Sequence, residues 1–449
     1  MMGEVADQLV ARSALARPFD YDIDEIRPLW LAAARERFAE RREQVPALAA
    51  RADDVGIDGI ESFADLVPLL FSHDSYKAYP RDFLDAGRWD LLGRWLRSLS
   101  TRPVPAIDAA GVTTQDDWIR QLGAADFPVY ASSGTSGRSS FLPASPADRE
   151  FTFDCLLRTL TWQHGVSPAE KLPVVVLAPS AGGSRALEYY RRVAERYGDP
   201  ARTFFLTDEP VRLHDLNQLA ALSRAVAAGT ATPEQIAAFR RDQQDRAARI
   251  DREWDRLAEQ VEGLAGERII LQGFWPQQYG LVERLRARGH ARLPLAPDTV
   301  LGVGGGTKGV DLPADFADQV FTFYGLDPSR EAGGYGMSEL SAALPEVAGR
   351  YRLQPWIIPL VLDETGTALA TPADGRLEGR FAFLDLALDG RWGGLISGDR
   401  VLVDLESSGF AVIPGTVARY SDLRGGSDDR LTCAGTVDAF VRGLSEQTS

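Results

Sequence analysis

A run rich in glycine and hydroxyl side chains, YASSGTSGRSS, occupies Tyr130–Ser140. Glycine leaves backbone N–H groups uncovered, so a loop of this kind after a strand forms a concavity that binds phosphate. Arg138 would add positive charge to it. The run lacks the Gly-Lys-Ser/Thr ending of the common P-loop. The residues alone therefore leave two interpretations open, a phosphate-binding loop and a surface turn or linker.

Two carboxylates further along the chain stand in short glycine-containing motifs. Glu339 ends the stretch GGYGMSE, and its hard oxygen atoms suit Mg²⁺. Asp399 lies in the stretch ISGD, in an expected turn before a strand. Each also has a plainer interpretation by itself, Glu339 as a carboxylate at a helix start and Asp399 as a turn residue.

Alternating strands and helices surround these motifs. Short apolar, β-branched runs predict strands, and apolar residues at helical spacing predict helices. The expected strands are Lys171–Pro179, Arg202–Thr207, Arg268–Leu271 and Thr299–Val303. The expected helices are Ile23–Val45, Leu84–Leu99, Ala147–His164, Gln277–Arg288, Pro313–Tyr324 and a helix capped by Thr232 that runs to about Leu264. This alternation predicts α/β layers with much parallel sheet, and the region from Tyr351 to Phe440 predicts a β-rich subdomain.

The composition narrows the class of protein. The 449 residues carry a net charge of −15, which disfavours nucleic acid and anionic membranes as main partners. Cys155 and Cys433 are too few for a disulfide framework, so we expect a reducing, cytoplasmic compartment. We expect neither a signal peptide nor a membrane-spanning helix. The four histidines show no spacing typical of metal ligands.

The order of the motifs resembles that of the adenylate-forming superfamily, which includes acyl-CoA synthetases, peptide-synthetase adenylation domains and firefly luciferase. The ordered motifs are the loop at Tyr130–Ser140, Gly304-Gly-Gly, Tyr335-Gly-Met-Ser-Glu339, Ser397-Gly-Asp399 and Ser427-Asp-Asp-Arg. The stretches SSGTSGRSSFLP, LPLAPDTVLGVGGGTKG and YGMSEL look most like the branch of the acyl-protein synthetase LuxE and phenylacetate-CoA ligase.

This resemblance implies a fold as well. It covers roughly Phe71 to Phe440 and implies the α/β N-terminal domain of these enzymes, with stacked α/β layers and a smaller β-rich subdomain. We therefore expect a helical region over residues 1–100, a nucleotide-binding core over 101–350 and a β-rich subdomain over 351–449. The chain ends nine residues after Phe440, so the C-terminal lid subdomain with its catalytic lysine is expected to be absent or vestigial.

The implied reaction is activation of a carboxylic acid. The carboxylate attacks the α-phosphorus of ATP, pyrophosphate leaves, and the acyl group passes from acyl-AMP to a thiol or an amine. Positioning and charge neutralisation would supply most of the catalysis. The resemblance also implies which residues bind each part of the substrates. Tyr335 would lie by adenine, Asp399 would bind the ribose, Ser338 would contact the α-phosphate and Glu339 would bind Mg²⁺. Gly304, Gly305 and Gly306 would border adenine and the acyl pocket, and the pyrophosphate end of ATP would be bound by Ser132, Ser133, Gly134, Thr135, Ser136, Gly137 and Arg138.

The chain departs from the family pattern at several positions. Ser139-Ser140 stand where many relatives have Pro-Lys, and Thr307 stands where acyl-protein synthetases often have Trp. Gly425-Gly426 replace the usual Gly-Arg, which leaves Arg424 or Arg430 to supply the cation.

Two further residues have alternative interpretations. Lys308 is either a substitute for the missing catalytic lysine or a solvated side chain, and Cys433 is either an acyl acceptor or a buried small hydrophobe. The acceptor stays open among CoA, a carrier-protein thiol, a protein cysteine and an amine. Two other functions also stay open: a non-catalytic member that binds a nucleotide or an acyl group, and an ATP-independent acyltransferase that uses Cys433.

Overall fold

The computed structural model describes most of the chain. The described residues are 3–80, 82–132, 139–212, 214–215, 222, 225–226, 229–304, 306–307, 310–404 and 411–420. The chain divides into two compact units. The first consists of Met1–Ala131, Arg138–Trp162 and Gly334–Asp429, and the second of Ser132–Gly137, Gln163–Gly333 and Arg430–Ser449.

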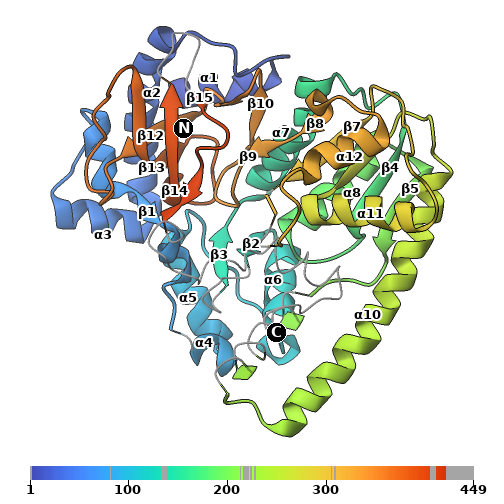
Figure 1. The fold of residues 1–449 in the computed structure, drawn as a ribbon. Helices are drawn as coiled ribbons and strands as arrows, with labels where there is room; N and C mark the ends of the chain where they lie inside the picture. The colour runs from blue at the N-terminus through green and yellow to red at the C-terminus, as the bar shows by residue number, and fades with distance from the viewer. Residues whose placement is uncertain are drawn as a thin grey trace. The chain divides into compact units, whose positions relative to one another are not determined.

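The second unit is built on a five-stranded sheet in the order β5-β4-β6-β7-β8. Strands β4, β5, β7 and β8 are labelled in Figure 1. Every neighbouring pair is parallel, as the alternation of strands and helices predicts. All side chains of β4 and β6 are buried, which is typical of a parallel sheet covered on both faces. The strands are β4 (Leu172–Pro179), β5 (Gly198–Thr207), β6 (Ile270–Phe274), β7 (Val300–Gly304) and β8 (Glu331–Ala332).

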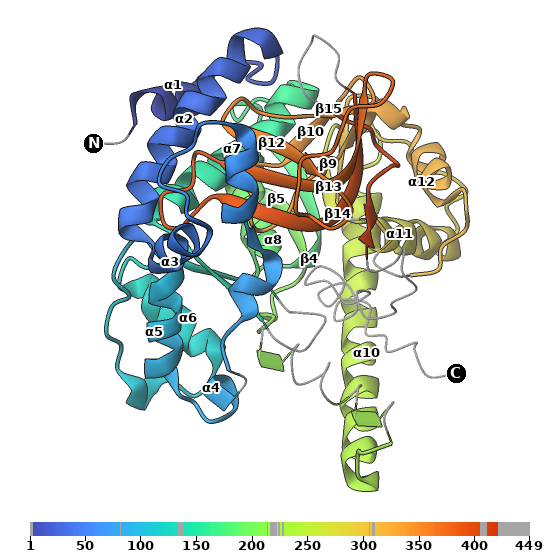
Figure 2. The same ribbon diagram turned by 90° about the vertical axis from the view of Figure 1, so that its left-hand side faces the viewer.

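Four helices accompany this sheet: α8 (Arg185–Tyr197), α10 (Pro233–Glu262), α11 (Trp275–Ala287) and α12 (Phe316–Tyr324). Helix α8 packs on β4 and β5, α10 on β5 and α11, and α11 on β6 and α12. Thr232 caps α10 as predicted, because its Oγ1 accepts from the Gln235 N–H at 3.2 Å while Gln235 Oε1 accepts from the Thr232 N–H. Figure 2 shows α10 as one continuous helix.

The first unit contains a nine-stranded, mostly antiparallel sheet. Its main order is β12-β13-β14-β15-β11-β10-β9, and both β1 and β16 pair with β14. The strands are β1 (Phe71–Ser72), β9 (Gly334–Tyr335), β10 (Leu344–Val347), β11 (Arg350–Arg352), β12 (Ile357–Leu362), β13 (Arg376–Asp385), β14 (Gly394–Asp404), β15 (Ala411–Val412) and β16 (Ala418–Arg419). A separate pair is formed by β2 (Val129–Ser132) and β3 (Ser140–Pro143).

The helices of the first unit come mainly from its N-terminal segment. They are α1 (Glu4–Ala11), α2 (Ile23–Gln44), α3 (Pro46–Val55), α4 (Asp82–Asp85), α5 (Trp89–Leu99), α6 (Gln115–Ala124) and α7 (Pro146–His164), of which the residues up to Trp162 belong to this unit. Helix α2 begins after Asp22, whose side chain accepts from the Asp24 N–H. Trp30 of α2 donates its indole N–H to the Pro355 carbonyl at 2.7 Å, which ties the helix to a segment 325 residues away.

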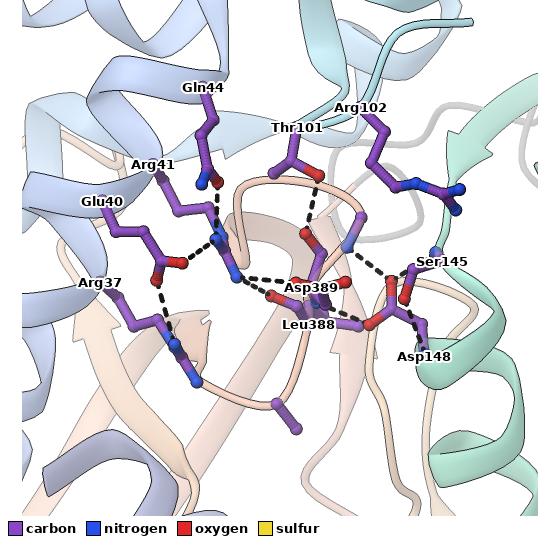
Figure 3. A network of polar contacts seen from close by, with 12 residues as sticks. Arg37, Glu40, Arg41, Gln44, Thr101, Arg102, Ser145, Asp148, Leu388 and Asp389 are labelled. Carbon is purple, nitrogen blue, oxygen red and sulfur yellow. Dashed lines mark hydrogen bonds and ion pairs between the residues drawn. The ribbon is translucent and has the colours of Figure 1, made fainter. Parts of the chain in front are cut away.

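Buried charges connect α2 and α7 with the loop at residues 386–391 (Figure 3). Arg37 donates to the Leu386 carbonyl at 3.0 Å, and Arg41 donates to the Leu388 carbonyl at 3.3 Å. On the other side, Asp148 of α7 accepts from the backbone N–H groups of Asp389 and Gly390 at 2.6 and 2.7 Å. The loop is therefore held by cations through its carbonyls and by a carboxylate through its amides.

Only glycine fits at position 390 of this loop. A Cβ atom there would lie 2.5 Å from the backbone of Ala144 and of Ser145, closer than Cβ atoms approach other atoms. The close approach lets the Gly390 N–H reach Asp148. Gly390 thus positions the loop against the start of α7.

Most predicted elements are confirmed, although several begin or end one to four residues from the expected position. Strand β6 begins at Ile270 because Arg268 forms ion pairs with Glu170 and Asp298 instead of entering the sheet. The helix expected from Leu84 is broken into α4 and α5, because Gly87 adopts a φ of +63°. Strand β5 is longer than predicted and begins at Gly198. Among the described helices, none is both long and apolar enough to span a membrane.

Candidate active site

Two residues that the motifs assign to adenosine meet in the first unit. The Tyr335 hydroxyl donates to Asp399 Oδ2 at 2.7 Å, although the residues are 64 positions apart. Strand β9 carries Tyr335 and β14 carries Asp399. Burial raises the Tyr335 pKa well above its usual range, and the adjacent Asp399 charge raises it further. The phenol therefore stays protonated and acts as a donor.

Aromatic packing fixes the Tyr335 ring. It meets Phe381 of β13 edge to face, with ring centroids 5.6 Å apart, and lies 6.1 Å from Tyr351 of β11 in a tilted arrangement. Edge-to-face aromatic pairs add about 0.5–1.5 kcal/mol beyond the burial of area. Three strands of one sheet thus determine where the phenol points.

Asp399 lies within β14 and not in the turn expected from the sequence, and the adjacent Ser397 and a neighbouring strand orient it. Ser397 Oγ donates to the Phe381 carbonyl at 2.7 Å and accepts from the Asp399 N–H at 3.1 Å. Arg419 of β16 lies opposite Asp399 in the register, and its Nε is 3.7 Å from Asp399 Oδ1. A carboxylate has about four lone-pair sites, so the Tyr335 hydroxyl and the Arg419 guanidinium leave room on Asp399 for further donors such as a diol.

Arg419 is a residue that sequence reasoning missed. The motifs predict Arg424 or Arg430 as the cation, and both residues lie outside the described part of the chain. Arg419 belongs to no motif, and only its register opposite Asp399 brings it to the site. A prediction of which strand pairs with β14 would have been needed to find it.

Ser338 and Glu339 follow β9 and are half-buried. Burial raises the pKa of the nearby Tyr76 to about 12, Arg391 opposes this shift, and Glu339 adds to it. The Tyr76 phenol is therefore neutral beside the Glu339 carboxylate. No group of three or more His, Cys, Asp or Glu side chains in the described part of the chain is arranged to hold a metal. A single carboxylate fits Mg²⁺, which commonly takes one or two carboxylates and completes its shell with substrate phosphates and water.

A buried carboxylate that the sequence analysis did not single out holds the residue two positions after Glu339. Asp385 accepts from the Ser341 N–H at 2.7 Å and from Ser341 Oγ at 3.0 Å, and also from the Ala387 N–H at 3.1 Å. Burial raises the Asp385 pKa to about 6, and the bonds from Ser341 oppose the shift. The only sequence signal for Asp385 is a charge inside the apolar run FAFLDLAL.

The Gly/Ser/Thr loop connects the paired strands β2 and β3. Ser133, Gly134, Thr135, Ser136, Gly137 and Arg138 lie outside the described residues, and only the backbone of Ser132 is described. After the loop, both Ser139 and Ser140 are buried, and the Ser139 carbonyl accepts from the Tyr79 hydroxyl at 2.8 Å. The exit of the loop is therefore anchored to the core of the first unit.

The glycine run assigned to the adenine and acyl border belongs to the second unit. Strand β7 ends at Gly304, and Gly306 adopts a φ of +64°, a conformation that favours glycine. Gly305, Lys308, Arg424 and Cys433 lie outside the described residues. Cys155 is buried in α7, as its helical setting predicts.

Comparison with known proteins rests on structure. No protein-family model matches the chain. No curated protein resembles it significantly in sequence. A 2-hydroxyisobutyryl-CoA ligase, solved in an open conformation with 2-HIB-AMP and CoA, matches with a TM-score of 0.50 and 16% identity over 88% of this chain and 75% of the ligase.

Two other solved structures are less similar. A fatty acyl-adenylate ligase from L. pneumophila, in complex with acyl adenylate and pyrophosphate, has a TM-score of 0.36 and 10% identity over 84% of this chain and 70% of its own. ATP-bound MatB from Rhodopseudomonas palustris has a TM-score of 0.35 and 16% identity, and the match covers 64% of this chain and 48% of MatB. These scores are too low to establish a shared fold, so the likeness in fold rests on the 2-hydroxyisobutyryl-CoA ligase. The chain therefore has the mixed α/β fold of the N-terminal domain of an adenylate-forming enzyme, as the sequence predicts.

Proposed function

We propose that this chain activates a carboxylic acid with ATP. One carboxylate oxygen of the acid attacks the α-phosphorus, the bond between the α-phosphorus and the bridging oxygen breaks, and pyrophosphate leaves with its electron pair. The product is an acyl-AMP, a mixed anhydride whose carbonyl carbon accepts a nucleophile. A thiol or an amine then takes the acyl group and AMP is released.

The observation that carries this proposal is the Tyr335–Asp399 pair. Two short motifs, far apart in sequence, lie in hydrogen-bond contact in a chain with the fold of an adenylate-forming enzyme. A surface turn at Asp399 would need neither the buried tyrosine nor the cation at Arg419. A carboxylate fixed beside an aromatic ring suits a nucleoside, because the carboxylate accepts from the ribose hydroxyls and the ring lies next to the base.

The roles proposed for the other residues are those that the resemblance to adenylate-forming enzymes implies, and each is compatible with the chemistry of the residue. Ser338 would donate a hydrogen bond to the α-phosphate, and the loop at residues 132–138 would take the pyrophosphate end through its amides and Arg138. Gly304, Gly305 and Gly306 would leave space beside adenine and the acid. Glu339 would hold Mg²⁺, which neutralises phosphate charge when bound.

The branch and the acceptor are further parts of the proposal. The stretches SSGTSGRSSFLP and YGMSEL favour a LuxE-like or phenylacetate-CoA ligase-like enzyme. CoA, a carrier-protein thiol, Cys433 and an amine are the acceptors to compare. Acid-dependent formation of acyl-AMP precedes each of these transfers, so it is the first activity to measure.

Pyrophosphate release across a panel of carboxylic acids tests the proposal. We expect ATP- and Mg²⁺-dependent release with at least one acid, and a loss of at least about tenfold in Glu339→Ala and in Asp399→Ala, or about 1.4 kcal/mol of transition-state stabilisation. Full activity in both variants would disprove the site assignment.

Two other outcomes favour the alternative functions. Nucleotide binding without pyrophosphate release from any acid favours a non-catalytic binding protein. Acyl transfer from acyl-CoA without ATP, lost in Cys433→Ala, favours the acyltransferase.

A further inference from the structure

Arg391 connects two segments that the proposed function places at the phosphates. Its side chain is 2% exposed. One terminal nitrogen, Nη1, donates to the Pro143 carbonyl at 3.0 Å, and the other, Nη2, donates to the Glu339 carbonyl at 3.1 Å. Pro143 ends β3, the strand that leaves the Gly/Ser/Thr loop, and Glu339 is the residue assigned to Mg²⁺.

The geometry of the guanidinium makes this connection rigid. Its donors lie in one plane at fixed angles, so two carbonyls bound by the same group have a fixed separation. A lysine ammonium is a single flexible point charge and cannot define that separation in the same way. Arg391 thus sets where the Glu339 backbone lies relative to the end of β3.

Asp385 holds the same motif from its other end. It binds both the N–H and the hydroxyl of Ser341, and Trp356 donates its indole N–H to the same hydroxyl at 3.2 Å. The Glu339 carbonyl and the Ser341 amide are therefore both fixed, on either side of Leu340. The Glu339 side chain therefore projects from a backbone segment that is fixed at the Glu339 carbonyl and at the Ser341 amide.

Arg391 and Asp385 differ from the other buried charges of this unit, such as Arg41, because their contacts lie on the Glu339 motif. Burying a charged group costs several kcal/mol, and an apolar side chain of similar volume often stabilises a core as well or better. Arg391 opposes the rise in pKa that burial gives to Asp148 and Asp385, and all three side chains are buried. Buried charges that are costly to desolvate are thus arranged around the backbone of the Glu339 motif.

We propose that Arg391 and Asp385 are positioning residues that fix Glu339 relative to the strand leaving the phosphate loop. This inference rests on the proposed adenylation function. The two residues do not touch substrate; they act through the Glu339 and Ser341 backbone. Their loss is expected to weaken Mg²⁺-dependent turnover more than it weakens the fold.

The test compares Arg391→Lys with Arg41→Lys. Arg41 is also 2% exposed and also donates to a carbonyl of the 386–391 loop, but it contacts neither motif (Figure 3). We expect Arg391→Lys to lower kcat for pyrophosphate release at least about tenfold and to raise the Mg²⁺ concentration for half-maximal rate, with the KM for the acid within about threefold. Arg41→Lys should keep kcat within about threefold while losing a similar amount of stability to urea.

Equal losses of activity in the two variants, at equal losses of stability, would overturn the proposal. Should Arg391→Lys fail to fold, Ser341→Ala provides a milder test, because it removes only the hydroxyl that Asp385 holds. It too should lower kcat and raise the Mg²⁺ requirement, and unchanged values would overturn the proposal.

Hydrogen exchange separates this inference from the proposed function. Peptides covering residues 336–342 should exchange faster in Arg391→Lys than in wild type, and at the wild-type rate in Arg41→Lys. This measurement needs no substrate. Faster exchange in a protein that releases no pyrophosphate would refute adenylation and leave the positioning intact, whereas unchanged exchange would refute the positioning.

Discussion

The two units differ in what they bury. Among the described residues, the charged side chains below a tenth exposure all lie in the first unit: Arg37, Arg41, Asp148, Asp385, Arg391 and Asp404. The polar side chains buried to the same extent in the second unit are all neutral: Thr207, Gln272, Gln277, Gln278 and Thr299. One unit has an ionic interior, and the other has an apolar interior with a few amides and hydroxyls.

This difference reflects two ways of satisfying the hydrogen-bonding groups of a buried backbone. The parallel sheet of the second unit satisfies its own N–H and C=O groups through strand pairing, and needs only apolar side chains around it. The first unit contains irregular segments, such as 386–391 and 336–342, in which only some backbone groups pair with other backbone groups. Buried Arg and Asp side chains supply the missing partners there. The contrast teaches that the ionic interior follows the irregular loops, one of which, residues 336–342, carries the Glu339 motif.

The largest expected effect comes from removing one of the buried charges. Asp148→Ala leaves the N–H groups of Ser145, Asp389 and Gly390 without their acceptor and should lower the free energy of unfolding by about 3–5 kcal/mol. Asp154→Ala on the same helix is the control, because its pair with Arg158 is partly exposed and worth about 0–1 kcal/mol. Urea denaturation measures the free energy of unfolding of both variants. If Asp148→Ala lost as little stability as Asp154→Ala, the buried charges of the first unit would not be needed for its stability.

The next effect concerns pH in the first unit. Burial raises the Asp385 pKa from 3.8 to about 6, so the native state binds this proton more tightly than the unfolded state does. The protonated form contributes its full stability below about pH 4, and this contribution is lost as the pH rises to about 6. At 1.36 kcal/mol per pKa unit, the loss amounts to roughly 3 kcal/mol. The free energy of unfolding of wild type minus that of Asp385→Asn should fall over this range. A difference that is flat between pH 4 and 7 would show that Asp385 titrates normally.

A smaller effect of opposite sign is expected in the second unit. Burial lowers the His164 pKa from 6.5 to about 4, Arg330 lowers it further, and a bond to the Glu331 backbone opposes the shift. The unfolded state therefore binds the proton more tightly, and the stability of wild type relative to His164→Gln should rise between pH 4 and 6.5. We expect about 1 kcal/mol, since the ring is partly exposed and solvent screens it. Urea denaturation at each pH measures this difference in the free energy of unfolding. A difference that falls between pH 4 and 6.5 would contradict the prediction.

The smallest effect is expected for a neutral amide. Gln278 is fully buried at the start of α11, and neither its Oε1 nor its Nε2 has a partner among the described residues. Gln278→Met keeps the volume and removes both polar atoms, so stability should change by less than about 1 kcal/mol or increase slightly. Gln278→Ala, which leaves a cavity, is the control for volume. A loss of several kcal/mol in Gln278→Met would mean that the second unit also depends on buried polar groups.

The regular elements were predictable because their signals are local. Thr232 with Pro233 marks the start of α10, and the apolar run at Leu172–Pro179 predicts β4. Errors arose where one residue overrides a pattern, as when Gly87 divides α4 from α5.

The site was only partly predictable. Tyr335, Glu339 and Asp399 stand in motifs, so their types and spacing identified them. Arg391 acts on partners 52 and 248 residues away along the chain, Asp385 on Ser341 44 residues away, and Arg419 on Asp399 20 residues away. No spacing rule links such distant positions. Charges inside apolar or glycine-rich runs were the available signal for Arg391 and Asp385.

The hydrogen bond from Trp30 to Pro355 has a consequence for how the protein is made. Helix α2 has nearby backbone partners at residues 58, 60 and 61, but its long-range backbone partners lie at residues 355, 386 and 388. The sheet of the second unit uses strands between Leu172 and Ala332, so the ribosome completes that sheet before the long-range partners of α2 exist, and we expect the second unit to fold first. Proteolysis of ribosome-bound chains that extend to about residue 375 should cut α2 before the parallel sheet. The N-terminus, although made first, would be among the last parts of the chain to become native.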